Sequence, residues 1–174
     1  MSSDPVSWTI YVLILLVVLI TNGLVSASLN ALDYVDRNKL NELREDEPNN
    51  KKAHLIHSFI KKPSRYHYPD RIFMYSMAII AIIVFNLIFY AKLDTYRFLP
   101  VIANVLFAIF YFALADIFPK KLAVQSADSY ALRLVKLQRF ICIVLLPITS
   151  LCLGVANLFL LILRKDIDVD DTQF

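Results

Sequence analysis

The chain has 174 residues, 58% of them hydrophobic, and its 18 lysines and arginines outnumber its 15 acidic residues. Four stretches of 18 to 28 residues almost lack charge, and about 20 helical residues cross the hydrocarbon core of a bilayer. This composition excludes a soluble globular domain and predicts an all-α membrane protein. The basic residues flank the apolar stretches, so they indicate membrane topology rather than nucleic-acid binding, and no spacing suggests the nucleophile and base of an enzyme. The four apolar stretches are residues 5–32, 72–91, 98–115 and 140–163.

The first stretch, residues 5–32, is expected to be a retained transmembrane helix, because it is long for a signal peptide and no basic residue precedes it. Asn22, Ser26 and Asn30 recur in it at intervals of four, which places them along one side of a helix. In hydrocarbon these groups must face other helices or a hydrated cavity, and Gly23 lets another helix approach closely. The stripe fits a site for a small hard cation, whereas ordinary helix packing is the commoner role of such a pattern.

The connection over residues 33–71 is predicted to form two amphipathic helices outside the hydrocarbon. The first continues the transmembrane helix and is broken by a Pro-Asn-Asn turn, and the second covers about residues 51–62 and ends at Pro63. His54 and His57 lie three apart on the second helix, which is a spacing that suits a metal ion. A solvated pair is the commoner outcome, since no further ligand accompanies them.

The third apolar stretch, residues 98–115, is followed directly by an acidic residue, Asp116, and Asn104 lies three turns before it. A carboxylate together with neutral side-chain oxygens is the ligand set that suits Mg²⁺ and similar hard cations. An ion pair between Asp116 and Lys120, four residues further on, explains the acidic residue equally well.

Basic residues predict the orientation of the chain in a cell membrane that it crosses several times. None precedes the first apolar stretch, whereas residues 33–71 hold nine and residues 119–139 hold five. By the positive-inside rule, the N-terminus lies outside and both basic segments are cytoplasmic. Basic residues flank the last stretch, 140–163, on both sides, and Pro147 lies within it. We therefore expect this stretch to bend and return to the cytoplasmic side, with a fourth full span as the alternative.

Several segments resemble, in the same order, those of the CNNM/CorC family of magnesium transport proteins. The Glu-Ile-Ile-Pro-Lys-Thr-Leu-Ala element of that family is similar to Asp116-Ile117-Phe118-Pro119-Lys120-Lys121-Leu122-Ala123. Its Ser-Gly/Ala-Ser-Glu-Thr-Ala-Leu segment is similar to Ser26-Ala27-Ser28-Leu29-Asn30-Ala31-Leu32. The turn Pro63-Ser64-Arg65 and the segment Leu145-Leu146-Pro147 match further elements, so the resemblance covers essentially the whole chain.

The resemblance implies three transmembrane helices, a bent juxtamembrane or re-entrant hydrophobic helix, and a cytoplasmic amphipathic helical connection. It implies a transmembrane domain over residues 1–165, and an acidic tail over residues 166–174 that is either the true end or the start of a linker to cytoplasmic CBS modules. A homodimer in the lipid bilayer is implied as well. The implied function is efflux-type transport of Mg²⁺ or a related divalent cation. Together with the polar stripe, the resemblance places the cation site between the first and third helices, on Asn22, Ser26, Ser28, Asn30, Asn104 and Asp116.

Departures from the family pattern favour a second function. Leu29 stands where the family has an acidic residue, Asp116 is one carbon shorter than the family's Glu, and the Gly-Asn-Asn element of the second helix has no equivalent near residues 73–76. Mg²⁺ sheds water reluctantly and needs several well-placed oxygens. The alternative function is therefore a non-transporting membrane scaffold or regulator that keeps the fold and has lost the ion site.

Overall fold

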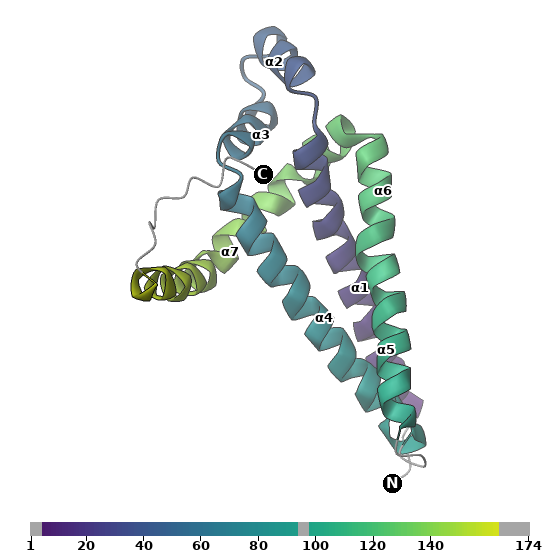
Figure 1. Cartoon of the computed structure of the whole chain (residues 1–174). Helices are drawn as coiled ribbons and strands as arrows, with labels where there is room; N and C mark the ends of the chain where they lie inside the picture. The colour runs from purple at the N-terminus through teal and green to yellow at the C-terminus, as the bar shows by residue number, and fades with distance from the viewer. Residues whose placement is uncertain (1–4, 94–97, 164–174) are drawn as a thin grey trace.

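The computed structural model describes residues 5–93 and 98–163, and the acidic tail expected over residues 166–174 lies outside them. The described residues form helices joined by short turns and include no strand, which confirms the all-α fold. Figure 1 shows α1, α4 and the continuous α5–η1–α6 running side by side. The elements are α1 (Pro5–Tyr34), α2 (Arg37–Asp46), α3 (Lys51–Lys61), α4 (Ser64–Leu93), α5 (Leu99–Phe112), the π-helix η1 (Ala113–Ile117), α6 (Phe118–Gln125) and α7 (Ala127–Ile162).

Helix α1 forms the centre of the fold, because it contacts α4, η1, α6 and α7. The larger core joins the C-terminal part of α1 to α3 and to the first half of α7, and Leu32, Ile56 and Val135 are almost completely buried in it. A smaller core lies where α1 meets α4 and α5, around Val18 and Ala81. Asn22 and Ser26 lie between the α1 positions that build these two cores, and Asn30 lies among those of the larger core, so the polar stripe is held in the packed part of the bundle.

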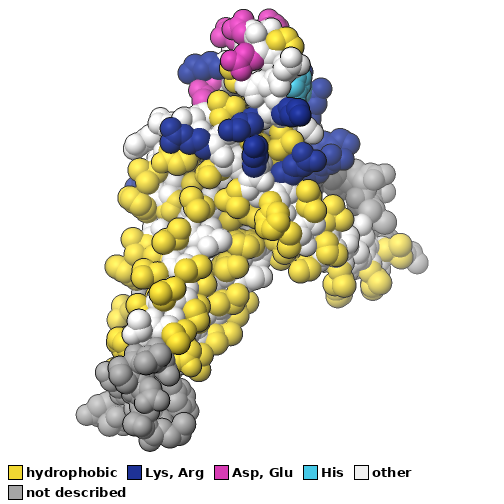
Figure 2. Space-filling model, turned by 180° about the vertical axis from the view of Figure 1, so that it is seen from behind, with side chains coloured by type: hydrophobic (Ala, Val, Ile, Leu, Met, Phe, Trp, Pro, Cys, Tyr) yellow, Lys and Arg dark blue, Asp and Glu magenta, His cyan; other side chains and the backbone are white. Residues whose placement is uncertain are grey.

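The outside of the long helices is apolar, as expected for surfaces that face lipid. Four helical segments are long and apolar enough to cross a membrane, and no more than a third of the residues in the most apolar part of each is buried. Figure 2 shows hydrophobic side chains covering this flank of the molecule, with lysines and arginines gathered between them and the α2–α3 tip. This pattern supports a multi-pass membrane protein. The four segments are Trp8–Tyr34, Ser64–Phe89, Leu99–Gln125 and Ala127–Ile162.

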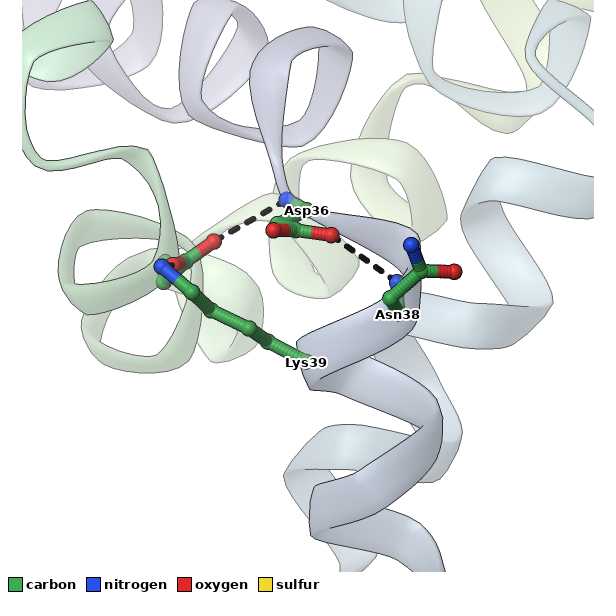
Figure 3. Close-up of polar contacts among 4 residues, drawn as sticks. Asp36, Asn38 and Lys39 are labelled. Atoms are coloured by element: carbon green, nitrogen blue, oxygen red, sulfur yellow. Dashed lines mark hydrogen bonds and ion pairs between the residues drawn. The ribbon is translucent and has the colours of Figure 1, made fainter.

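The two expected amphipathic helices are present as α2 and α3, and local caps set where they begin. The expectation that the first of them continues the transmembrane helix is wrong, because α1 ends at Tyr34 and Asp36 caps α2 as a separate helix. A side-chain oxygen of Asp36 accepts the Asn38 N–H at 2.9 Å, and Asn50 caps α3 in the same way. Figure 3 shows how the start of α2 is held against α7: Asp128 accepts the Asp36 N–H at 3.0 Å and pairs with the Lys39 ammonium at 3.3 Å. These contacts fix the α2–α3 tip over one end of the bundle.

Helix α7 is continuous through Pro147, from Ala127 to Ile162. Its first half packs against α1, α3 and α4, whereas nearly all side chains of its second half are exposed. In Figure 1 it leaves the bundle at an oblique angle. A proline removes one backbone hydrogen bond, but the flanking turns keep the helix intact here. The expected bend and return to the same side is therefore not confirmed, and the helix is long enough for a fourth span.

Candidate functional site

Two of the residues singled out in the sequence meet across the bundle. The Ser26 hydroxyl of α1 donates to Oδ1 of Asp116, in η1, at 2.5 Å, and it lies 3.2 Å from the Asp116 backbone carbonyl oxygen. Ser26 is fully buried, and Asp116 is half-buried. The expected alternative, an ion pair between Asp116 and Lys120, is absent from the described residues. The carboxylate is thus directed at α1 rather than at its own helix.

A π-helical turn positions Asp116. In η1 the Phe118 N–H bonds to the carbonyl of Ala113, five residues earlier, instead of the usual four. Pro119 gives a reason for the wider turn, because it has no N–H to offer the carbonyl of Ala115, whose α-helical partner it would be. Single π turns in α-helices often coincide with functional sites. Here the turn places both the side chain and the carbonyl of Asp116 next to Ser26.

Gly23 allows the two helices to come this close. A Cβ atom built on Gly23 would lie 3.2 Å from Cγ of Pro119, which is tighter than nearly all real contacts of this kind. The proline ring therefore occupies the space that a side chain would fill. This is the close approach that the sequence predicted for Gly23, and the partner is the proline of the family element.

Asn22 and Tyr111 add two further oxygens. Asn22 lies one turn before Ser26 on the same side of α1, and Tyr111 lies five residues before Asp116. Both side chains are buried and close to each other, yet Asn22 Oδ1 and the Tyr111 hydroxyl have no hydrogen-bond partner of good geometry. Sequence reasoning missed Tyr111, although a single hydroxyl among phenylalanines in an apolar stretch is a usable signal, since a buried phenol needs a partner.

The Ser26–Asp116 cluster, meaning Asn22, Ser26, Tyr111 and Asp116, contains one carboxylate and three neutral oxygens. Hard cations such as Mg²⁺ and Ca²⁺ prefer such ligands, whereas softer metals prefer sulfur or imidazole. Within residues 5–93 and 98–163, no three His, Cys, Asp or Glu side chains come together in a metal-binding group. The charge of this cluster therefore comes from Asp116.

Asn30 has a supporting position. Its Nδ2 donates to the backbone carbonyl of Ser26 at 2.7 Å, which is a bond between successive turns of the same helix. Asn30 also lines a polar cavity at the α2–α3 end of the bundle. It thus lies between the cluster and that cavity.

Ser28 and Asn104 lie elsewhere. Ser28 is buried on a different side of α1 from Ser26, and its hydroxyl has no partner. Asn104 exchanges two amide hydrogen bonds with Asn86 of α4, at 2.9 and 3.0 Å. It lies twelve residues before Asp116, which corresponds to about 18 Å along a helix. The structure therefore brings Ser26 to Asp116, with Asn22 one turn away on the same side of α1, and it places Ser28 and Asn104 elsewhere.

A second buried carboxylate joins α4 to α7. Asp70 is fully buried and accepts a hydrogen bond from Nε2 of Gln138, while its Oδ1 and Oε1 of Gln138 have no partner. Sequence reasoning missed this pair, because Asp70 lies just before the second apolar stretch, where a solvated acid is the ordinary expectation. None of its atoms contributes to the Ser26–Asp116 cluster.

Comparison with known proteins identifies the family of the chain. None of the curated proteins compared with the chain matches it. A family model described as the cyclin M transmembrane N-terminal domain, CNNM, matches residues 13–173 and so covers nearly the whole chain. That family is linked to divalent cation transport. The match confirms the resemblance found in the sequence: the chain belongs to the CNNM transmembrane domain family.

Proposed function

We propose that this protein transports Mg²⁺ or a related divalent cation across the membrane, by efflux, through the Ser26–Asp116 cluster. The observation that carries the proposal is the contact between the Ser26 hydroxyl and the Asp116 carboxylate, made between two helices inside an apolar bundle. A carboxylate within a membrane helix is energetically unfavourable, and such a residue is usually retained because it has a function. A bound cation would stabilise that charge.

The proposed role of each group follows from its chemistry. Asp116 supplies the negative charge, and Ser26, Asn22 and Tyr111 supply neutral oxygens. On binding, the Ser26 hydroxyl would turn a lone pair to the cation and release its hydrogen bond to Asp116. The two oxygens that lack hydrogen-bond partners would gain one. Mg²⁺ keeps several of its waters in proteins, so four protein oxygens are an adequate set.

The surroundings of the cluster suit access from one side. Toward the α2–α3 end, Asn30 borders a polar cavity of about 1080 Å³. Toward the opposite end, Tyr111 of the cluster itself packs with Val18 and Ala81 in a buried apolar core. An alternating transporter must open this core and close the cavity in a second conformation. We propose that the conformation described here accepts or releases the ion on the α2–α3 side.

The proposed topology follows the distribution of basic residues. The N-terminus is outside, residues 33–71 and 119–139 are cytoplasmic, and the polar cavity therefore faces the cytoplasm. Helices α1, α4 and α5–α6 span, and α7 returns to the cytoplasmic side. A reporter enzyme fused after residue 174 should be active in the cytoplasm, and activity outside the cell would establish α7 as a fourth span. We also propose a homodimer, with CBS modules in the cytoplasm if the chain continues.

The test is binding of Mg²⁺ to the purified chain by isothermal titration calorimetry. Asp116→Asn keeps the shape of the side chain and removes its charge, so the Mg²⁺ affinity should fall at least about tenfold. Asp128→Asn is the matched control, because it removes a carboxylate at the start of α7 and should leave the affinity unchanged. An Asp116→Asn protein that binds Mg²⁺ as tightly as the wild type would place the site elsewhere. Liposome flux with the same variants extends the test to transport.

A membrane scaffold or regulator without an ion site is the second candidate function. It is favoured by Leu29, which stands at the family's acidic position and packs in the larger hydrophobic core. The family's Gly-Asn-Asn element is missing from α4 near residues 73–76. Ser76, which lies there, is exposed, and its hydroxyl donates to the Ile72 carbonyl of its own helix at 2.8 Å, so it adds no ligand. Failure of the wild-type protein to bind any divalent cation would favour this function.

A further inference from the structure

In the polar cavity at the α2–α3 end, basic side chains outnumber acidic ones. The cavity is bounded by the C-terminal end of α1, by α2 and α3, by the start of α4 and by α6. Its volume of about 1080 Å³ is large enough for a ligand much bigger than a bare ion. Four side chains with fixed positive charge line it from four different helices: Arg37, Lys61, Arg71 and Lys120.

The acidic side chain that lines this cavity already has hydrogen-bonding partners in the protein. Its one carboxylate, that of Asp33, accepts a hydrogen bond from the Tyr66 hydroxyl at 2.9 Å and lies 3.2 Å from the His67 ring. Among the described residues, none of the four cations has a carboxylate within ion-pair distance. The cavity therefore carries an excess of positive charge that described protein groups do not neutralise.

His57 also lines the cavity, next to Lys61 among its basic residues. Burial lowers the pKa of its imidazole, and the positive charges of Arg44 and Lys61 lower the pKa further. A lowered pKa means that adding another positive charge here is unfavourable. The effect agrees with the geometry, in which basic side chains converge and acidic ones do not.

We propose that this cavity binds a phosphate-bearing anion. Guanidinium groups offer paired donors that match phosphate oxygens, and the lysines add point charges. Figure 2 shows lysines and arginines gathered where the apolar surface ends on one face of the molecule, and this is the level expected for lipid headgroups. A lipid headgroup and a soluble phosphate compound share this chemistry, so the experiment must separate them.

The position of the cavity gives the bound anion a consequence for the cation site. Asn30 lines the cavity and bonds to the carbonyl of Ser26, so the cavity adjoins the Ser26–Asp116 cluster. Four uncompensated cations repel a divalent cation that approaches through the same cavity. A bound phosphate group would cancel part of this repulsion and ease the passage of the ion. This consequence, unlike the anion site itself, rests on the proposed function.

The experiment measures pyrophosphate binding to the full chain in nanodiscs of phosphatidylcholine, by calorimetry, with a chelator present so that no divalent cation takes part. The wild type should bind, and the double variant Arg71→Gln/Lys120→Gln should bind at least about tenfold more weakly. Arg65→Gln/Lys121→Gln is the matched control: it removes the same two charges from α4 and α6 at positions that do not line the cavity. Asp116→Asn should leave pyrophosphate binding intact, so a failure of the cation site and a failure of the anion site give different results.

A second arm replaces part of the phosphatidylcholine with phosphatidylglycerol. If a lipid headgroup is the natural occupant, phosphatidylglycerol will compete with pyrophosphate, and the wild type will retain more of this lipid than the cavity variant. If the occupant is soluble, the lipid will leave pyrophosphate binding unchanged. Equal binding of pyrophosphate by the wild type and the cavity variant would overturn the proposal. So would a wild type that neither binds pyrophosphate nor retains phosphatidylglycerol above the variant.

Discussion

Two of the polar contacts between the helices of the bundle differ in whether their hydrogen-bonding groups are all paired. Asn86 and Asn104 join α4 to α5, and each amide donates one hydrogen bond to the other. Ser26 and Asp116 join α1 to η1, but their contact involves a carboxylate, and two buried oxygens beside it lack partners. A pair of amides that satisfies itself needs no ligand and serves as packing. A contact that contains a carboxylate, with unpaired oxygen atoms near it, is the one that a bound cation would stabilise.

Among the substitutions that test this comparison, Gly23→Leu is expected to have the largest effect on stability and on Mg²⁺ binding. The new side chain would overlap the Pro119 ring, force α1 and α6 apart and take Ser26 away from Asp116. We expect a loss of about 1–3 kcal/mol in the free energy of unfolding and a loss of most Mg²⁺ binding. Chemical denaturation and calorimetry measure the two effects.

Gly154→Leu is the control for this change. A Cβ on Gly154 would meet no atom within 4 Å, and leucine has a higher helix propensity than glycine. The Gly154→Leu protein should therefore keep both stability and Mg²⁺ affinity. If both glycine variants behaved alike, the close approach of α1 and α6 would not matter for the site.

A smaller effect is expected from breaking the amide pair. In Asn86→Leu, the Asn104 amide loses its hydrogen-bond partner in an apolar environment. The unfolding free energy should therefore fall by about 1 kcal/mol. The double variant Asn86→Leu/Asn104→Leu should recover part of this loss, because neither amide remains unpaired. Mg²⁺ affinity should stay unchanged in both. A loss of affinity in the double variant would return Asn104 to the cation site, as the sequence had predicted.

The two serines of α1 should respond differently to removal of the hydroxyl. Ser26→Ala deletes a proposed ligand and should weaken Mg²⁺ binding by up to about tenfold. It should also lower the unfolding free energy, because the Asp116 carboxylate loses its hydrogen-bond donor. Ser28→Ala removes a buried hydroxyl that has no partner, so it should leave the affinity unchanged and the unfolding free energy within about 0.5 kcal/mol. If both substitutions changed the Mg²⁺ affinity equally, Ser26 would have no role in binding that Ser28 lacks.

The smallest effect is expected at the surface. Lys39 and Asp128 form an ion pair whose side chains are 68% and 41% exposed. Lys39→Ala should lower the unfolding free energy by less than about 1 kcal/mol, and added salt should reduce the difference further. Denaturant titration at two salt concentrations checks this. A larger loss would show that the contact of α2 with α7 supports the whole α2–α3 tip.

The sequence by itself determined which segments are helices and which sides of them are polar. Hydrophobic length set the four long apolar helices, and the caps at Asp36 and Asn50 set the starts of α2 and α3. The interval of four placed Asn22 and Ser26 on one side of α1, and the structure keeps them there. These features depend on residues close together in the chain, so local periodicity is enough to predict them.

Tertiary structure alone decided which groups meet. Ser26 and Asp116 are 90 residues apart, and no periodicity states that α1 faces η1. The same holds for Asn104, which pairs with Asn86 on α4 instead of joining the cluster. The partners of a buried polar group are fixed by how whole helices pack, through contacts such as Gly23 against Pro119. Lys120 lines the basic cavity instead of pairing with Asp116 for the same reason: the π turn directs the carboxylate to α1, and the lysine is left to face the cavity.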